Sequence, residues 1–391
     1  LDVRAVYIDH GLQDESKQWA KHCAQSCQQL NIPFQTISVN ARAAPGESPE
    51  ASARHARYRA LATLVAEGHC LLTAQHQDDQ AETFLLQLLR SAGPAGLAAM
   101  PFCDEFSAGL HMRPLLVFTQ AQILGYAKQH DLVWVEDPSN QDDRYDRNYL
   151  RNQVMPMLKQ RWPTIDQAIA TVAKQQAENK HLLEYYAAAE LKRINADTDS
   201  LPVDALLSFD EPQLRNILRY WIKQQSIPVP SRKILQQIMQ QMFTEKEDAQ
   251  SKVSWSGFEM HRHKGELIIV PTVEHDDKQA FDWDGKSELV IESLSKKLVM
   301  EKTQGKGLAK NIIGQNLRVC FRQGGESIKP AGRKETHSLK KLFQEAAVPS
   351  WQRSRMPFIY LGEELIAVVG YWIADEYKVD KDQVGFEPVL I

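Results

Sequence analysis

Alternation between short apolar runs and helical segments is the feature that most constrains the fold of this chain. Apolar runs at 3–11, 34–39 and 69–74 alternate with segments of helical periodicity at 16–31, 48–68 and 79–90. Strands separated by helices of this length form a parallel sheet with helices on both faces. We therefore predict an α/β fold. Ligands of such folds bind beyond the carboxyl ends of the strands, where residues 9–11 and 74–79 lie.

The rest of the chain has a different pattern. Helical periodicity covers 165–194, 211–225 and 231–243, and residues 251–270 are predicted to form a pair of strands that turns at Lys264-Gly265. A polar, acidic stretch at 271–286 has the composition of a linker, and short strands with one helix follow it. A length of 391 residues allows two or three domains. We predict domains at 1–160, at 161–275 (mainly helical) and at 286–391 (small, α+β).

Charge is unevenly distributed along the chain. The net charge is −4, but residues 292–356 hold 14 lysines and arginines against 5 acids, a local charge of +9. This segment is either a basic module for nucleic acid or a solvated lysine-rich surface. Its densest clusters contain Arg333, Lys334, Lys340 and Lys341. No apolar run approaches the ~18 residues of a membrane span, and five cysteines form no disulfide framework, so we expect a cytoplasmic protein.

The acidic segment at 73–83 is the first candidate site. It gathers His76, Asp78, Asp79 and Glu82 where a strand ends and a helix begins. One interpretation is a capping box with Asp79 as N-cap and Glu82 as its reciprocal partner. That interpretation does not explain why Asp78 and His76 lie in the same turn. Carboxylates this close raise each other's pKa unless a cation or a metal ion lies between them. The alternative is a site for Mg²⁺ or for a cationic substrate.

Two sets of arginines are the second candidate. Arg54 and Arg57 are spaced i, i+3 on a predicted helix. Arg144, Arg147 and Arg151 recur at i, i+3 and i+7. Each set is either a phosphate-binding face or a salt-bridged surface, and the second set has acids nearby for pairing. Those acids are Asp142, Asp143 and Asp146.

Six ordered motifs carry a resemblance to a known family. They are DHGL at 9–12, EASARHARY at 50–58, HQDDQAET at 76–83, LRSAGPAGLAAM at 89–100, RPLL at 113–116 and EDPSNQDDRYDRNYLRNQVMP at 136–156. In this order and spacing the chain resembles the bacterial tRNA(Ile)-lysidine synthases, which are PP-loop ATP pyrophosphatases with an adenine nucleotide alpha hydrolase-like fold. Residues 322–373 resemble the last domain of the longer members. The family's Ser-Gly-Gly-x-Asp-Ser loop does not occur in these residues, and we expect it and the first strand to precede Leu1.

The resemblance implies a reaction and its participants. The family uses ATP to adenylate the oxygen on carbon 2 of the wobble cytidine of tRNA(Ile) with a CAU anticodon, releasing pyrophosphate, and L-lysine then displaces AMP to form lysidine. ATP and Mg²⁺ are the implied cofactors, and the protein is expected to be a monomer or homodimer with no membrane association.

The same resemblance implies roles for particular residues. Asp79 and Glu82 would bind lysine and act in catalysis with Arg54, Arg147 and Arg151. His10, Gly11 and Arg54 would bind ATP, and Asp78 and Asp79 are possible Mg²⁺ ligands. The second and third predicted domains would bind tRNA, the third through Arg333, Lys334, Lys340 and Lys341.

Two other functions stay open at this level. One is a related PP-loop enzyme such as a tRNA thiolase. Thiolases carry paired cysteines near the active site, whereas Cys23 and Cys27 lie on a predicted helix. The other is a catalytically dead tRNA-binding protein, which is favoured if the glycine loop is truly absent.

Overall fold

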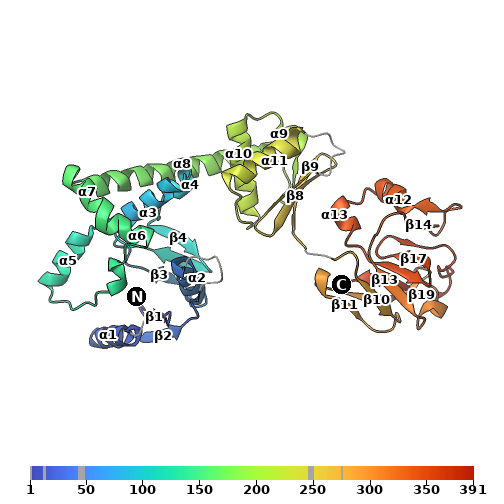
Figure 1. Cartoon of the computed structure of the whole chain (residues 1–391), viewed down its shortest axis with the longest axis horizontal. Coiled ribbons are helices and arrows are strands. Elements are labelled where there is room, and N and C mark those ends of the chain that lie inside the picture. Colours follow the sequence, from blue (N-terminus) through green and yellow to red (C-terminus); the bar gives the residue numbers. More distant parts are fainter. Residues whose placement is uncertain (1, 12–14, 43–48, 245–250, 274–275) are drawn as a thin grey trace. The chain divides into compact units, whose positions relative to one another are not determined.

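The computed structural model describes residues 2–11, 15–42, 49–244, 251–273 and 276–391. Leu12 of the first motif and Ser48 at the start of the second predicted helix lie outside these residues. The chain divides into two compact units, Leu1–Tyr186 and Ala187–Ile391. In Figure 1 the colour runs along the sequence from blue at the N-terminus to red at the C-terminus. The three predicted domain ranges stay a prediction.

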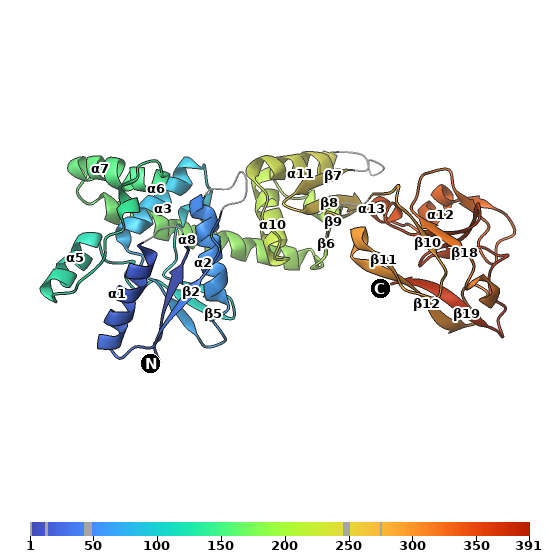
Figure 2. The same cartoon turned by 60° about the horizontal axis from the view of Figure 1, so that its bottom comes forward.

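Two small sheets organise the first unit. In one, β1 (Ala5–Asp9) pairs in parallel with β2 (Phe34–Ser38), and α1 (Ser16–Gln29) packs against both strands (Figure 2). In the other, β3 (Cys70–Leu72) pairs in parallel with β5 (Gly109–Met112). The α/β class is confirmed. The predicted single parallel sheet is divided in two, and β4 (Cys103–Phe106) adds an antiparallel edge because a tight hairpin joins it to β5.

The helices of the first unit hold the acidic segment in place. They are α2 (Pro49–Ala62), α3 (Gln77–Leu89), α4 (Pro94–Leu97), α5 (Gln120–Gln129), α6 (Asp146–Tyr149), α7 (Met155–Arg161) and most of α8 (Ile165–Arg193). A 3-10 turn covers Pro138–Gln141, and a π-helical segment covers Leu150–Val154. An apolar cluster joins α3 to α7 and α8 through Ala81, Phe84, Met155, Ile169 and Ala173. This packing fixes the first turn of α3, which carries the predicted acidic site.

The second unit begins with a four-stranded sheet of order β6-β9-β8-β7. The strands of this sheet are β6 (Ser200–Pro202), β7 (Lys252–Trp255), β8 (Phe258–His263) and β9 (Glu266–Pro271). The helices of this part are α9 (Val203–Leu206), α10 (Glu211–Gln224) and α11 (Arg232–Thr244). The predicted strand pair at 251–270 is three strands, because Ser256-Gly257 forms a second turn. Both turns, at Ser256-Gly257 and at Lys264-Gly265, have positive φ at their two central residues, the geometry that matches the twist of a hairpin.

The remainder of the second unit is rich in strands. A five-stranded sheet has the order β10-β13-β16-β17-β18, and a three-stranded sheet has the order β11-β12-β19. Their strands are β10 (Ala280–Trp283), β11 (Leu289–Ile291), β12 (Lys296–Gln304), β13 (Leu317–Cys320), β16 (Phe358–Leu361), β17 (Glu364–Val368), β18 (Trp372–Ile373) and β19 (Val384–Leu390). Two further short strands pair with each other, β14 (Ser327–Ile328) and β15 (His337–Ser338).

Two short helices complete this part, α12 (Leu339–Glu345) and α13 (Ser350–Arg353), besides 3-10 turns at Glu292–Leu294 and Lys310–Ile312. The Ser338 hydroxyl accepts a hydrogen bond from the Lys341 amide and so caps the start of α12. The stretch predicted as a linker contains β10, which pairs with β13. Among the described residues, no helix is both long enough and apolar enough to cross a membrane.

Candidate active site

The start of α3 is built differently from the predicted cap. The N-cap is His76 and not Asp79, and Asp79 is the third helical residue, whose carboxylate accepts a hydrogen bond from the His76 amide at 3.1 Å. This bond satisfies one of the amides that a helix start leaves without a partner. Glu82 takes no part in the cap. Asp79 therefore caps the helix through one carboxylate oxygen and keeps the other for a different partner.

Arg151 joins the two acids that were predicted to act together. Its guanidinium donates to both oxygens of Glu82, at 2.7 and 2.8 Å, and to Asp79 at 3.0 Å. Glu82 is only 1% exposed. Arg147 of α6 also contacts α3, donating to the Thr83 hydroxyl at 2.9 Å and facing Glu82 at 3.7 Å. Four of the five predicted catalytic residues, widely separated in sequence, thus form one cluster.

The arginine stripe does not pair with its own acids as a salt-bridged surface would. Only Arg144 does so, contacting Asp142 at 2.6 Å in solvent. Asp143 instead accepts hydrogen bonds from Asn152 and Gln153, at 2.8 Å each. Arg151 lies in the π-helical segment, a form of helix that occurs often at functional sites. The inward pairing of Arg147 and Arg151 favours a functional site over a surface.

Lys159 completes the cluster and was missed in the sequence. Its ammonium bridges Asp78, at 2.6 Å, and Asp166 at the start of α8, at 2.8 Å. Asp78 also accepts a hydrogen bond from the Gln120 amide at 2.7 Å. The sequence did hold a signal, since Lys159 lies eight residues after Arg151 on the continuing helical segment.

The cluster carries one more carboxylate than it carries permanent cations. The carboxylates are Asp78, Asp79, Glu82 and Asp166, and the cations are Arg147, Arg151 and Lys159. Burial lowers the pKa of His76, but the hydrogen bond to Asp78 and the charges of the other acids outweigh it and raise that pKa above its ordinary value. An excess of negative charge that attracts a proton also attracts an ammonium group.

The pKa of Glu82 and the pKa of Asp78 are shifted in opposite directions. Burial raises the pKa of Glu82, and its pairing with Arg151 offsets this only in part. Burial acts in the same direction on Asp78, but hydrogen bonds from His76, the Gln120 amide and Lys159 hold the pKa of Asp78 well below its usual range. Of these two acids, Asp78 is the one that its partners keep ionised, and Glu82 is the one whose protonation burial favours.

A magnesium ion does not fit the acids predicted to bind it. All four carboxylate oxygens of Asp78 and Asp79 already face donors, which are Lys159, the Gln120 amide, Arg151 and the His76 amide. No group of three or more metal-binding side chains occurs among the described residues. Two protein cations and two backbone amides thus occupy the ligand positions, and this arrangement does not favour the predicted site at Asp78 and Asp79.

The carboxyl end of β1 forms a second polar group. Arg57, and not Arg54, contacts His10, donating to its Nε2 at 3.0–3.2 Å. Burial and then the Arg57 charge lower the pKa of His10, and because Nε2 accepts from Arg57, a neutral ring carries its proton on Nδ1. That Nδ1 is buried without a partner among the described residues. Beside it, Gly11 has φ +62 and open space where a side chain would lie. The role of this end of β1 in binding ATP stays a prediction.

Arg54 lies elsewhere on α2. Its guanidinium stacks 4.8 Å from the centre of the Tyr58 ring, and the residue is exposed. Tyr58 in turn packs 5.8 Å from His111 of β5. Arg54 therefore does not contact His10 in this structure, although its side chain is exposed and a ligand could still reach it.

A buried group around His111 was also missed. His111 is 3% exposed, lies 2.7 Å from the Thr73 hydroxyl and receives a hydrogen bond from Arg113 at 3.0 Å. Burial and the Arg113 charge lower the pKa of His111 to about 4. Arg113 belongs to the RPLL motif, to which no role was assigned. The group ties β5 to the carboxyl end of β3, just before the acidic segment.

The four basic residues predicted to bind tRNA lie on the surface of the second unit. Lys340 and Lys341 are exposed on α12. Arg333 is exposed and pairs with Glu345 at 2.8 Å, and Lys334 follows it in the same turn region. Together they form an exposed basic face around α12.

Comparisons with known proteins place the chain in one group. A family model described as PP-loop domain matches residues 1–158, one described as TilS substrate binding domain matches 201–268, and one described as TilS substrate C-terminal domain matches 317–388. The tRNA(Ile)-lysidine synthase of Coxiella burnetii is 41% identical over 385 residues, covering 98% of this chain and 86% of its own. Proteins of the same name from Methylococcus capsulatus and Proteus mirabilis are each 36% identical, covering 98% of this chain and 89% and 87% of their own.

Proposed function

This chain belongs to the tRNA(Ile)-lysidine synthase family, and from that premise we propose that it joins L-lysine to the wobble cytidine of tRNA(Ile) with a CAU anticodon. The similarity over 98% of the chain is the observation that carries the proposal. ATP adenylates the oxygen on carbon 2 of the cytidine, which activates that carbon, and pyrophosphate leaves. The side-chain amine of lysine then attacks that carbon and AMP leaves, so one lysine, one AMP and one pyrophosphate correspond to each lysidine.

The cluster at the start of α3 binds the lysine in this proposal. Asp79 and Glu82 supply negative charge, and Arg151 orients both carboxylates through its bonds to them. Supporting this role, the cluster has one carboxylate more than its arginines and lysine neutralise. The attacking amine must be neutral, and Glu82, whose pKa burial raises, is placed to accept its proton.

The nucleotide belongs at the end of β1. His10 and Gly11 hold the adenosine, with Arg57 fixing the His10 ring. When bound, ATP supplies the adenylyl group. Arg54, Arg147 and Arg151 are the arginines we assign to the developing negative charge of the phosphates, because preorganised cations stabilise such charge most effectively. The exposed basic face at Arg333, Lys334, Lys340 and Lys341 binds the tRNA away from its anticodon.

One assay tests the proposal. The full encoded protein is incubated with ATP, labelled L-lysine and a tRNA(Ile) transcript carrying CAU, and a matched transcript has uridine at the wobble position. We expect label and pyrophosphate release only with the CAU transcript. Pyrophosphate release with a sulfur donor replacing lysine would support a thiolase instead. Tight tRNA binding with no pyrophosphate release would indicate a binding protein, and either result would overturn the proposal.

A further inference from the structure

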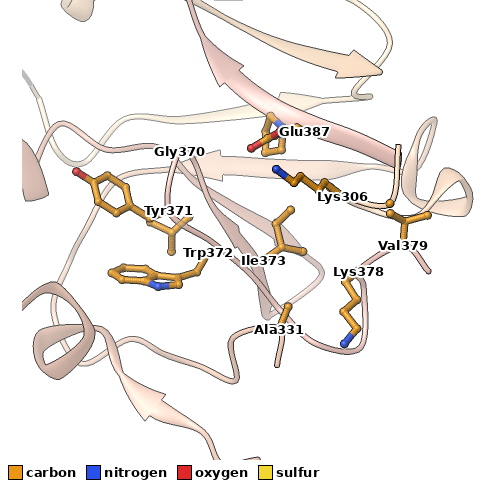
Figure 3. Close-up of a pocket in the computed structure, with 13 residues that line it drawn as sticks. Lys306, Ala331, Gly370, Tyr371, Trp372, Ile373, Lys378, Val379 and Glu387 are labelled. Atoms are coloured by element: carbon orange, nitrogen blue, oxygen red, sulfur yellow. The ribbon is translucent and has the colours of Figure 1, made fainter. Parts of the chain in front are cut away.

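A cavity in the second unit has no role in the proposed reaction. It measures about 280 Å³ and lies between the turn 305–307 after β12 and the turn 369–371 between β17 and β18 (Figure 3). This volume is at the lower limit of ligand pockets, which hold roughly 300–1,000 Å³. A cavity of this size accommodates one flat group with a charged substituent, not a duplex.

The first turn is preformed by its glycines. Gly305 and Gly307 both have positive φ, and a side-chain carbon on either would lie 2.5 Å from backbone atoms of Lys381 or Phe386. Neither position tolerates a side chain without moving the opposing backbone. The turn therefore holds Lys306 at a fixed place on the rim of the cavity.

The rim carries a lysine beside the carboxylate of Glu387. Lys306 is exposed, and its ammonium has no ion-pair partner within the part of the chain that the structure describes. Figure 3 shows its side chain reaching across the cavity beside Glu387. Lys378 lines the cavity too, but Asp375 binds it at 2.8 Å. Of the two lysines that line the cavity, Lys306 is therefore the one available to an anionic group.

The opposite wall is aromatic. Tyr371 is 42% exposed, and its ring centre lies 5.4 Å from that of Trp372. Trp372 packs in turn 5.2 Å from the buried ring of Phe343, which fixes its orientation. Neither the Tyr371 hydroxyl nor the Trp372 indole N–H forms a hydrogen bond within the described residues. An exposed aromatic face beside a free lysine is the combination that binds unpaired nucleotides, through stacking and phosphate contact.

We propose that this cavity binds a single unstacked nucleotide, with its base against Tyr371 and Trp372 and its phosphate at Lys306. Glu387 on the rim repels a second phosphate and accepts a hydrogen bond from an exocyclic amine, which cytosine, adenine and guanine carry and uracil lacks. The nucleotide is either an unpaired residue of the bound tRNA or a free mononucleotide. The tRNA source rests on the proposed function, whereas the free source does not.

Binding measurements on the full encoded protein test this inference. The probes are the tRNA(Ile) transcript, CMP and UMP, and the variants are Lys306→Ala, Tyr371→Ala and Tyr371→Phe. Lys296→Ala is the matched control, because Lys296 is equally exposed on β12 but does not line the cavity. Removing the stacking of one base lowers affinity by roughly five- to a hundredfold. Removing the cation that neutralises one phosphate lowers the salt-dependence slope by about one unit.

The outcomes separate the two sources. If tRNA is the source, Tyr371→Ala and Lys306→Ala weaken tRNA binding by these amounts, while Tyr371→Phe and Lys296→Ala do not. If the nucleotide is free, the same two variants lose CMP binding and keep tRNA affinity. In both cases CMP binds more tightly than UMP. Unchanged binding of both tRNA and CMP in Tyr371→Ala and Lys306→Ala overturns the inference. Because no readout is lysidine formation, that result is independent of whether the wild type makes lysidine.

Discussion

The acidic cluster at α3 and the basic face at α12 use charge in opposite ways. In the cluster, Asp79, Glu82 and Arg151 hold one another at 2.7–3.0 Å, and Glu82 is almost fully buried. On the basic face, Lys340 and Lys341 are exposed and have no ion-pair partner among the described residues. A buried ion pair fixes the positions of its two side chains, and removing one partner lowers the stability of the fold. Exposed, unpaired charges fix no geometry but attract polyanions over about a Debye length.

This difference predicts that mutations in the two regions have different effects. Changes in the cluster should alter the reaction and the stability of the fold together. Changes on the basic face should alter affinity for nucleic acid and leave the fold intact.

The largest effect is expected from Glu82→Gln. The variant removes the charge opposite Arg151, which keeps only Asp79 as partner, so we expect a loss of about 1–3 kcal/mol of unfolding free energy. Lysine transfer per folded molecule should fall far more than this, because the substrate ammonium loses its main countercharge. Thermal melts and labelled-lysine assays measure the two effects.

Arg144→Ala is the matched control for Glu82→Gln, since it breaks the exposed pair with Asp142. We expect it to change neither stability nor turnover. Normal lysine transfer by Glu82→Gln would show that the acid is only structural.

Arg54→Ala and Arg147→Ala sharpen the comparison, because one side chain is exposed and the other belongs to the cluster. A charge-assisted phosphate contact is worth roughly 1.5–3 kcal/mol, or about ten- to a hundredfold in rate. We expect Arg54→Ala to reduce pyrophosphate release even with saturating tRNA, and Arg147→Ala to weaken placement of the anticodon as well. The measurement is pyrophosphate release across a tRNA titration.

Arg59→Ala, on an exposed position of the same helix as Arg54, is the control. Full rescue of Arg54→Ala by excess tRNA would reassign it to RNA binding. An Arg147→Ala protein without any defect would return the arginine stripe to a purely structural role.

The double variant Lys340→Ala/Lys341→Ala tests the basic face. Both side chains are exposed, so we expect an unchanged melting temperature. Binding of tRNA should weaken, and the slope of log affinity against log salt should fall by about one for each phosphate that the variant no longer neutralises. Filter binding at several salt concentrations measures this. An identical slope in variant and wild type would mean that α12 does not contact the tRNA.

The smallest effect concerns Lys159→Met and acid stability. Hydrogen bonds from His76, the Gln120 amide and Lys159 hold the pKa of Asp78 below its usual range. The ionised Asp78 therefore stabilises the fold above pH ~4, and this contribution is lost as the pH falls through the lowered pKa. The variant should lose about 1 kcal/mol at neutral pH and show less further loss on acidification. Urea unfolding at neutral and acid pH, with the exposed Lys174→Met of α8 as control, checks this. Equal acid sensitivity in Lys159→Met and wild type would contradict the assignment.

Local patterns predicted most of the elements but not their partners. Helical periodicity located α8, α10 and α11 to within one residue at each end, because these helices are long and bury one continuous face. The Ser256-Gly257 turn was missed, since serine has no strong preference for positive φ. The strand β10 was missed because its polar surroundings resemble a linker and its pairing with β13 is non-local.

For the candidate site, too, local patterns predicted the residues but not their partners. Asp79, Glu82, Arg147 and Arg151 were each suggested by local spacing, but only the fold shows that the acids and arginines pair with one another. Arg57 was set aside in favour of Arg54, because i, i+3 spacing cannot tell which residue faces the end of β1. His111 was missed because a single histidine carries no spacing signal, and Lys159 was missed because its spacing from Arg151 does not show that it pairs with Asp78 and Asp166.

The most direct test of the contrast between the two regions is an initial-rate grid of labelled-lysine transfer over lysine and tRNA concentrations. The grid compares Glu82→Gln with Lys340→Ala/Lys341→Ala. We predict that Glu82→Gln stays slow at saturating tRNA, whereas the double lysine variant recovers the wild-type rate once tRNA saturates and keeps its KM for lysine. Full recovery of Glu82→Gln by tRNA, or a raised lysine KM in the double variant, would contradict the account.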